Sequence, residues 1–388
     1  MKIAVCLPSY NEASNIQNIT KIIDQGLANL SLKKNELKAV IVNIDSDSSD
    51  ETNRLFDETE TTHQKHSIVV AGEGGKGRNI LEFCRYVAEN GIDYCVTIDT
   101  DITSADPEWV VKLALPMIED VAVYVTPLYE RSRFEGSSTN HFTFPIIYAL
   151  TGQIIRQPIA GDFGFTSQLA REMLNSDFIN SEAVQKYGID IFMTVTAVRT
   201  GKYIANVDLG KKIHAPSFNK LEYMFPQIAA SVLMSTTAKF SETQTVSIGD
   251  EINILPNLNF NHREAAEEMN KRAIGVLEPL ELDWIGKEAI DSFLQSTKSQ
   301  ADMVSRWADL LVLWFSHFHK LSLDDGKAMQ AGQELLPFFV VRATNFWFWA
   351  ETVEVVDVER IIRQQAELLR ENLIQYDNYS AHRFTSRS

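Results

Sequence analysis

An apolar stretch of the sequence ends in two carboxylates two residues apart, Asp99 and Asp101. Side chains at this spacing share a face of a strand, and hard divalent cations such as Mg²⁺ and Mn²⁺ prefer oxygen ligands of this kind. A cation held there could bridge a diphosphate and neutralise charge as the phosphate leaves. The spacing alone leaves a second interpretation open, in which the Asp pair caps a helix that begins near Pro107.

A polar segment with three Asp and three Ser residues occupies positions 45–52. Ser and Asp before a helix are ordinary N-caps, and Ser49 or Asp50 could be only that. Asp45 directly follows an apolar stretch, which makes it the better candidate for a hydrogen bond to a nucleotide.

Four glycines surround Lys76 in residues 72–78, where the sequence is Gly72-Glu73-Gly74-Gly75-Lys76-Gly77-Arg78. Glycines between a strand and a helix let backbone N–H groups approach a phosphate, and the two basic side chains add positive charge. The segment is not a P-loop, because Lys76 is followed by glycine rather than by Ser or Thr.

Three further residues each have a chemical and a structural interpretation. His214 is either an incidental histidine or a neutral imidazole that completes a metal site. Asp190, early in a helical pattern, is either a helix cap or a carboxylate directed at sugar hydroxyls. Asp162, in Gly161-Asp162-Phe163-Gly164, is either part of a turn or an acid at the reacting centre.

Strands alternate with helices through the first 100 residues. Apolar strand patterns cover residues 2–7, 37–44, 67–70 and 94–98, and helical patterns cover residues 16–27, 52–61 and 79–88. Near-continuous Val and Ile runs of this kind predict a parallel sheet covered on both faces, an α/β fold. In such sheets, ligands bind beyond the carboxyl ends of the strands, where all the polar segments above fall.

The pattern changes in the second half of the chain. Residues 121–128 and 203–208 are expected strands, residues 129–140 a polar loop, and residues 183–200 and 221–239 helices. From about residue 241 the strand signals fade, and five broadly helical segments follow. We therefore expect an α/β domain of residues 1–240, with halves of about 1–120 and 121–240, and an all-helical domain of residues 241–388.

The amino-acid composition limits the classes of molecule that the protein can bind and the compartment in which it works. The 388 residues contain 36 Lys and Arg against 52 Asp and Glu, a formal net charge of -16, which repels a nucleic-acid backbone. Three cysteines lie in apolar stretches without metal-ligand spacing, as expected of buried thiols in a reducing compartment. No apolar run reaches the roughly 18 residues that a membrane span needs, and the short apolar run at the N-terminus ends at Pro8. We expect a cytoplasmic protein without stable membrane insertion.

Taken in order, these segments resemble the GT-A nucleotide-sugar glycosyltransferases of family 2 type, whose fold is a Rossmann-like, mostly parallel sheet covered by helices. Residues 8–12, Pro8-Ser9-Tyr10-Asn11-Glu12, resemble the P-x-Y-N-E opening, residues 45–52 the nucleotide loop, and residues 99–101 the D-x-D metal motif. A narrower resemblance is to the mannosylglycerate synthase and glucosyl-3-phosphoglycerate synthase group. It is carried by Lys76-Gly77, Asp99 to Ser104, Pro158-x-x-Gly161-acid, Tyr187 to Asp190, His214 and a helical C-terminal region.

The resemblance implies a retaining, Mg²⁺- or Mn²⁺-dependent transfer of glucose or mannose from a nucleoside diphosphate sugar to D-glycerate or 3-phosphoglycerate, in compatible-solute synthesis. The implied site residues fall into four groups. The metal ligands are Asp101, His214 and Asp99; the nucleotide-sugar contacts are Pro8, Tyr10, Glu12, Asp45, Lys76, Asp99 and Thr100; the catalytic group is Asp101, Asp162 and Asp190; and the acceptor contacts are Arg131, Ser138, Thr139 and Asn140. An Arg in the last group suits an anionic acceptor, because a guanidinium grips a carboxylate bidentately.

The sequence departs from the group at two places. Asp162 stands where these enzymes more often carry Glu, which shortens the reach of the side chain by one methylene, and residues 129–140 match neither relative closely.

Two other functions stay open: a polyprenyl-phosphate or polysaccharide glycosyltransferase at the membrane, and a nucleotide-sugar-binding protein without transfer activity. Four Trp residues in the C-terminal helices are expected in a core or in a homodimer interface.

Overall fold

The computed structural model describes residues 1–34, 36–213, 220–236, 245–248, 254–255, 260, 262–319, 321 and 324–385. The chain forms two compact units. The first contains Met1–Glu130 and Arg156–Ile252, and the second contains Arg131–Ile155 and Asn253–Ser388. This division differs from the expected one at 240/241, because residues 131–155 belong with the C-terminal helices.

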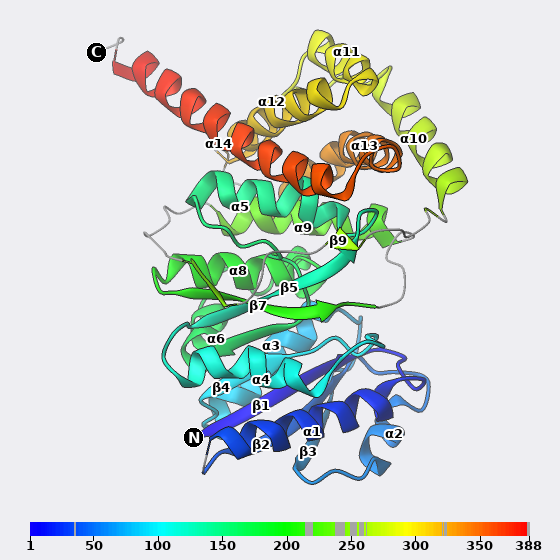
Figure 1. Cartoon of the computed structure of the whole chain (residues 1–388). Coiled ribbons are helices and arrows are strands. Elements are labelled where there is room, and N and C mark those ends of the chain that lie inside the picture. Colours follow the sequence, from blue (N-terminus) through cyan, green and yellow to red (C-terminus); the bar gives the residue numbers. More distant parts are fainter. Residues whose placement is uncertain are drawn as a thin grey trace. The chain divides into compact units, whose positions relative to one another are not determined.

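The first unit is built on a mixed sheet (Figure 1). Its strands are β1 (Lys2–Ser9), β2 (Lys38–Asp45), β3 (Gln64–Val69), β4 (Tyr94–Thr97), β5 (Tyr124–Ser132), β6 (Phe163–Thr166), β7 (Ile204–Lys211) and β8 (Thr245–Ile248). They lie in the order β3-β2-β1-β4-β6-β5-β7-β8. Only the pairs that β6 makes with β4 and β5 are antiparallel. The expected α/β fold with a mostly parallel sheet is confirmed.

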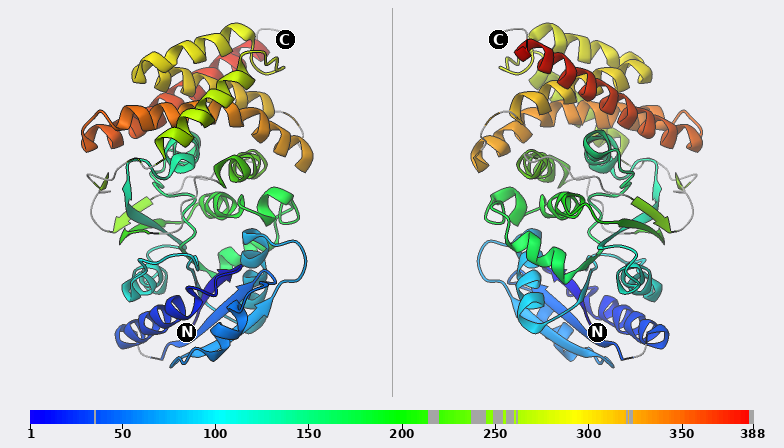
Figure 2. Two further views of the ribbon diagram at one scale, coloured as in Figure 1. Left: turned by 90° about the vertical axis from the view of Figure 1, so that its right-hand side faces the viewer. Right: turned by 90° about the vertical axis from the view of Figure 1, so that its left-hand side faces the viewer.

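Helices cover both faces of this sheet. They are α1 (Ile16–Lys33), α2 (Thr52–Glu58), α3 (Lys76–Asn90), α4 (Pro107–Ile118), α6 (Ser167–Leu174), α7 (Glu182–Gln185), α8 (Ile189–Arg199) and α9 (Leu221–Ser235). Helices α1 and α4 pack together on one face, and α3 packs with α6 and α8 on the other (Figure 2). Seven of the eight residues of β1 are buried, as a strand covered on both faces requires.

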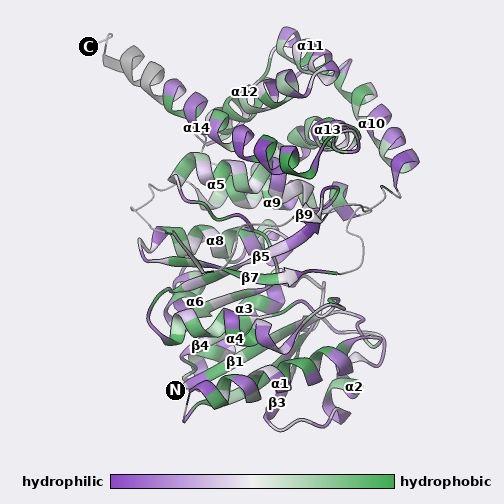
Figure 3. Cartoon of the chain, viewed as in Figure 1, coloured by the Kyte–Doolittle hydropathy of each residue, from purple (hydrophilic) through white to green (hydrophobic). Residues whose placement is uncertain are grey.

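Helix α1 shows why these segments fold as they do. Ile16, Ile19, Ile23, Leu27 and Leu30 recur at intervals of three or four residues and are all fully buried, so one apolar stripe faces the sheet. Hydrophobic and hydrophilic residues alternate along the same helix in Figure 3. Helix α1 begins where the carbonyl of Glu12 accepts a hydrogen bond from the Ile16 N–H at 2.9 Å.

The sequence patterns miss or misplace several elements. Strand β6 has only four residues and begins inside the segment Gly161-Asp162-Phe163-Gly164, for which a turn was one of two interpretations. The predicted loop at 129–140 contains the end of β5. The predicted helix 183–200 is two helices, α7 and α8, with a break at residues 186–188. Two short strands, β8 and β9 (Ile254–Leu255), lie beyond residue 241, where strand signals fade.

The second unit is helical apart from strand β9, which pairs with Arg131 and Ser132 at the end of β5. Its other elements are the π-helical turn η1 (Thr139–Thr143), α5 (Phe144–Thr151), α10 (Arg263–Leu277), α11 (Lys287–Gln295), the 3-10 turn η3 (Ser296–Lys298), α12 (Gln300–Phe318), α13 (Asp325–Ala350) and α14 (Val355–Thr385). Residues 131–155 join this unit because the apolar helix α5 packs against α14. Among the described residues, no helix has both the length and the apolar character that crossing a membrane requires.

The expected burial is confirmed for the three cysteines and for Trp307, Trp314 and Trp347, whereas Trp349 is only partly buried. Trp307 and Trp314 are fully buried, and their indole N–H groups donate to the carbonyls of His141 and Ala331 at 2.7 and 2.9 Å. The three cysteines, Cys6, Cys84 and Cys95, are buried free thiols.

Because α1 and α4 pack closely at Gly26, we expect replacement of this glycine by alanine to destabilise the protein, although alanine usually stabilises a helix. A Cβ at Gly26 would lie 2.5 Å from the Pro107 carbonyl oxygen and 2.8 Å from a Val110 methyl group. We expect Gly26→Ala to lower the free energy of unfolding by about 1–3 kcal/mol despite the better helix propensity of alanine. The matched control is Gly275→Ala on α10, where a Cβ would meet nothing within 4 Å, and a gain of about 0.5–1 kcal/mol is expected. Chemical denaturation of both variants tests this, and a Gly26→Ala protein as stable as the parent would contradict it.

Candidate active site

Two loops at the carboxyl ends of β1 and β2 are joined by hydrogen bonds. The backbone N–H of Asn11 donates to Ser48 Oγ at 2.8 Å, and Asn11 Oδ1 accepts from the N–H of Ser49 at 2.9 Å. The N–H of Glu12 donates to Thr52 Oγ1 at 2.8 Å. Asn11 has a φ of 56°, a left-handed conformation that Asn tolerates better than most residues. The two motifs that the sequence analysis singled out separately therefore form one surface.

Asp45 is fully buried at the base of this surface. Its carboxylate accepts hydrogen bonds from the hydroxyls of Ser9 at 2.9 Å and Ser48 at 2.6 Å, and from the Ser48 N–H at 2.7 Å. Asp45 thus holds the loop that follows β2, and its contact with a nucleotide stays a prediction. Asp50 accepts from the N–H groups of Thr52 and Ala13, both at 3.0 Å, and so holds the loop. The N-cap of α2 is Glu51, so neither Ser49 nor Asp50 occupies the expected capping position.

The Asp pair after β4 does not cap the next helix. Asp106 is the N-cap of α4, where its side chain accepts from the Glu108 N–H at 2.8 Å and Pro107 occupies the first helical position. The alternative interpretation of Asp99 and Asp101 is therefore wrong.

The backbone around this pair is anchored to β1 and α1. Thr100 is buried, and its hydroxyl donates to the Pro8 carbonyl at 2.8 Å. Asn15 Nδ2 donates to the carbonyls of Thr100 and Ile102 at 2.7 and 2.8 Å. Thr100 and Pro8 therefore hold the loop that carries the Asp pair. The side chain of Tyr10, in contrast, is 59% exposed.

Asp99 lies between two ammonium groups. Lys76 Nζ is 2.8 Å from Asp99 Oδ1, and Lys212 Nζ is 3.4 Å from Asp99 Oδ2. Each lysine also meets a second carboxylate. Lys76 Nζ lies 3.3 Å from Asp190 Oδ1, and Lys212 Nζ lies 2.6 Å from Asp162 Oδ2. Three carboxylates and two ammonium groups thus form one network with a net negative charge.

Asp162 is fully buried and its oxygens are fully engaged. Oδ1 accepts from the backbone N–H of Asp99 at 2.9 Å, and Oδ2 accepts from the hydroxyl of Tyr129 as well as from Lys212. These bonds fix the backbone at Asp99, so the geometry favours a positioning role for Asp162 over direct contact with a reacting group. Gly161 permits this approach, because with its φ of 85° a Cβ would overlap the Asp99 carboxylate.

Asp190 lies in the first turn of α8 but does not cap the helix, whose N-cap is Gly188. Its side chain is directed to Lys76, the first residue of α3. Gly77 lets α3 begin this close to α7, since a Cβ there would lie 1.8 Å from the Val184 carbonyl oxygen. Arg78 bends back to the Ala71 and Glu73 carbonyls and so shapes the glycine-rich loop itself.

Neighbouring carboxylates keep the Lys76 side chain protonated. Burial acts to lower the pKa of Lys76, but Asp190 and Asp99 outweigh it and raise that pKa above its ordinary value. Burial raises the pKa of Asp190, and Lys76 opposes this change. At neutral pH, Lys76 is therefore a cation held in place by acids on two different elements.

The sequence analysis missed Tyr129 and Lys212. Lys212 lies two residues before the candidate ligand His214, and Tyr129 is the first residue of the predicted polar loop 129–140. Neither position carries a local signal for the network, because their partner Asp162 is on a different segment. His214 lies outside the described residues, within which no group of three His, Cys, Asp or Glu side chains could hold a metal ion.

The predicted acceptor residues all belong to the second unit. Thr139 and Asn140 are buried in η1, where Asn140 Nδ2 donates to the Glu135 carbonyl at 3.1 Å. Ser138 precedes η1, and its carbonyl accepts from the Thr143 hydroxyl. Arg131 is partly exposed at the end of β5. Their contact with an acceptor stays a prediction.

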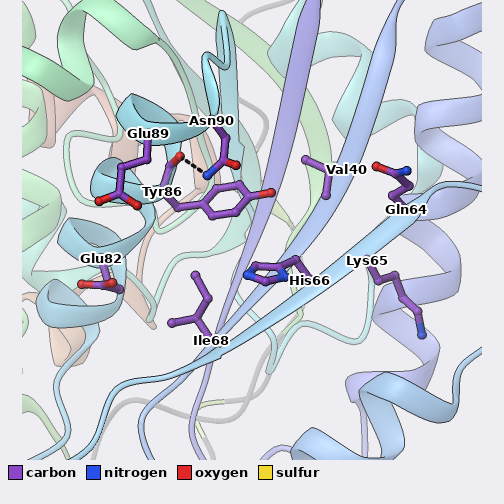
Figure 4. Close-up of a pocket in the computed structure, with 9 residues that line it drawn as sticks. All are labelled: Val40, Gln64, Lys65, His66, Ile68, Glu82, Tyr86, Glu89 and Asn90. Carbon is purple, nitrogen blue, oxygen red and sulfur yellow. Dashed lines mark hydrogen bonds between the residues drawn. The ribbon is translucent and has the colours of Figure 1, made fainter.

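A separate groove lies on the sheet between β2, β3 and α3 (Figure 4). His66 and Tyr86 stack there with ring centroids 5.3 Å apart. None of the predicted site residues lines this groove, and we assign it no part in the chemistry.

The pairing of Lys212 with Asp162 predicts a large loss of stability when the cation is removed. Lys212→Met would leave the Asp162 carboxylate buried without its ion-pair partner, and we expect a loss of about 3–5 kcal/mol in the free energy of unfolding. Replacing both residues, Lys212→Met with Asp162→Asn, should recover most of the loss. Lys211→Met, at an exposed neighbouring lysine, is the control and should be nearly neutral. Equal effects of the two lysine changes in urea denaturation would refute the pairing.

Glu12 predicts a pH dependence of stability. Burial and then the nearby Asp101 raise the pKa of Glu12 from 4.5 to about 7, against the opposing charge of Lys220. The folded chain therefore binds more protons than the unfolded chain between these values, so stability falls as pH rises from about 4.5 to 7. Glu12→Gln should flatten this fall and raise the melting temperature at pH 8, measured in a chelator. Glu60→Gln, an exposed control, should follow the parent, and a parallel curve for Glu12→Gln would show that Glu12 is not the group responsible.

Several solved structures are similar to this chain. Two are glucosyl-3-phosphoglycerate synthase from Mycobacterium tuberculosis, one in complex with phosphoglyceric acid and one with Mg²⁺ and uridine-diphosphate, at 22% and 23% identity. Each match covers 60% of this chain and 79% of the other, with a TM-score of 0.46. A mycobacterial protein matches at 24% identity over 60% of this chain and 74% of the other, with a TM-score of 0.45. Likenesses this distant carry no argument about what this chain binds. No curated protein matches it by sequence.

A family model matches part of the chain more directly. Residues 4–178 match the model described as glycosyl transferase family 2, which is less than half of the chain. The match includes β1 to β4 and the network residues Lys76, Asp99 and Asp162 of the first unit, together with residues 131–155 of the second. This part of the chain is therefore similar to glycosyl transferase family 2.

Proposed function

We propose that this protein is a metal-dependent, retaining glycosyltransferase that moves glucose or mannose from a nucleoside diphosphate sugar to D-glycerate or 3-phosphoglycerate. The observation that carries the proposal is the position of Asp99, with Lys76 and Lys212 on either side, at the carboxyl end of β4 in the part of the chain that matches glycosyl transferase family 2. In open α/β sheets, this edge is where nucleotides bind.

The acidic residues at this edge fit a divalent cation. Asp99 and Asp101 present hard oxygen donors, and Asp101 lies close enough to Glu12 to add to the effect of burial in raising the pKa of Glu12. In the proposal, Asp101 and His214 would hold Mg²⁺ or Mn²⁺ with support from Asp99. The bound cation would stabilise the diphosphate leaving group.

The protein groups have distinct parts in the proposed transfer. Asp190, held by Lys76, faces the hydroxyls of the transferred sugar, and Lys76 contributes positive charge close to the diphosphate. Asp162, Tyr129 and Lys212 fix the Asp99 backbone, so little reorganisation is needed when charge develops. An acceptor hydroxyl attacks the anomeric carbon on the leaving-group side and gives its proton to the departing phosphate.

The acceptor is proposed to be a small carboxylate because of Arg131. A guanidinium makes two parallel hydrogen bonds to a carboxylate, which gives both affinity and orientation. Ser138, Thr139 and Asn140 complete the proposed acceptor segment, and a homodimer through the C-terminal helices is part of the same proposal.

A matrix of substrates tests the whole proposal. GDP-, UDP- and ADP-linked glucose and mannose are paired with D-glycerate and with 3-phosphoglycerate in Mg²⁺ or Mn²⁺, and nucleoside diphosphate release and product mass are measured. Acceptor-dependent release from one donor is the expected result. Donor binding without release or transfer would favour the non-catalytic alternative, and flotation of the protein with liposomes would favour the membrane enzyme.

Removing one proposed metal ligand tests how much the metal contributes to turnover. Asp101→Ala should lower turnover by about two to three orders of magnitude, because charge on the leaving group is no longer neutralised. Asp106→Asn is a matched control at the next helix, where Asn caps as well as Asp, and should keep normal turnover. Near-normal turnover of Asp101→Ala with its metal dependence intact would remove Asp101 from the site.

A further inference from the structure

Asn15 occupies the N-cap position of α1 but does not cap the helix. Asn is among the residues preferred there, because its side chain can accept a hydrogen bond from a free N–H group of the first turn. In α1 the Asn15 side chain makes no such bond. Its Nδ2 instead donates to the carbonyls of Thr100 and Ile102, at 2.7 and 2.8 Å. The amide therefore joins α1 to the loop that follows β4.

The two carbonyls belong to the residues immediately before and after Asp101. An Asn amide group has two N–H donors, so Asn15 can use one on each carbonyl. At the other end of the amide, Asn15 Oδ1 accepts from Asn18 Nδ2 at 3.4 Å. One side chain thus holds the backbone on both sides of Asp101.

The side chain of Asp101 does not fix its own direction. It makes no hydrogen bond or ion pair within the described part of the chain. Asp99, in contrast, lies between the ammonium groups of Lys76 and Lys212. The direction of the Asp101 carboxylate therefore depends on how its backbone is held.

Beyond Asp101, the loop is tied to the end of β7. The Thr103 N–H donates to the Ile213 carbonyl at 2.9 Å, and the Ser104 hydroxyl donates to the Lys211 carbonyl at 2.8 Å. These bonds hold the far end of the loop, whereas the amide on α1 acts at its centre.

We propose that Asn15 is a positioning residue for the divalent cation, because it fixes the backbone that carries Asp101 before the cation binds. The inference rests on the proposed function, in which Asp101 is a ligand of Mg²⁺ or Mn²⁺. Groups that orient a metal ligand increase affinity, since the ligand need not be ordered when the metal binds. Helix α1 gives Asn15 a rigid base, because Ile16 and Ile19 next to it are fully buried.

Metal binding by the full chain, without turnover, tests the inference. Equilibrium dialysis against Mn²⁺, alone and with UDP, GDP or ADP, measures the metal retained by the protein in the absence of sugar donor and acceptor. Asn15→Ser keeps a residue that caps helices as well as Asn does, but its short side chain cannot hold both carbonyls. We expect the dissociation constant for Mn²⁺ to rise by about 10- to 100-fold.

Two further variants separate positioning from stability. Gly26→Ala destabilises the same helix where it packs on α4, away from the Asp101 loop, and should bind Mn²⁺ as the parent does. Asn15→Gly removes the side chain at a position that accepts glycine, and should lose affinity as Asn15→Ser does. Thermal unfolding in a chelator compares the stability of all the variants.

The outcomes distinguish this inference from the proposed function. If Asn15→Ser and Asn15→Gly bind Mn²⁺ as tightly as the parent while Asp101→Ala does not bind it, the cation site stands and the role of Asn15 is refuted. An equal loss of affinity in Gly26→Ala would also refute it, since Asn15 would then act only through stability. If the parent retains no Mn²⁺ under any condition, or Asp101→Ala binds it equally well, the cation site itself is refuted and this inference with it.

Discussion

The ion pairs around Asp99 are the interactions on which the candidate site depends. A carboxylate and an ammonium group buried together cost several kcal/mol each in lost hydration, and close pairing must offset that cost. Lys212 meets this requirement by contacting Asp162 at 2.6 Å and the Ala160 carbonyl at 2.7 Å. Because Asp162 also accepts from the Asp99 N–H, the network fixes the end of β4 as well as its side chains.

This network explains how the short side chain of Asp162 reaches the backbone at Asp99. Asp162, one methylene shorter than Glu, is placed by the short antiparallel strand β6 directly beside Asp99. The glycine before it allows this approach, since any side chain there would overlap the Asp99 carboxylate. Asp190 lies on α8 and joins the network by pairing with Lys76.

The two units treat buried charge differently. In the first, Lys76 and Lys212 are each shared between two carboxylates. In the second, Arg342 contacts Gln365 and the ring of Phe346, and among the described residues no carboxylate pairs with it. Paired charges of the first kind hold a rigid arrangement of side chains, whereas a buried charge without a partner lowers the stability of its surroundings.

Much of this protein follows from local patterns in its sequence. The parallel strands β1 to β4, the helices between them and the C-terminal helices follow from periodicity, because burial on one or both faces dictates where apolar residues recur. The motifs at Asp45, Lys76 and Asp99 are also visible, since each lies at the end of a strand or in the segment between a strand and the next helix, and this edge of the sheet is where ligands bind. What periodicity cannot show is pairing between distant segments. Strand β6 is four residues long and antiparallel, Lys212 meets Asp162 across 50 positions of sequence, and α5 joins the helical unit by packing on α14. Such contacts depend on how distant segments pack together, so the roles of Tyr129 and Lys212 become visible only when the folded chain brings their partners within a few ångströms.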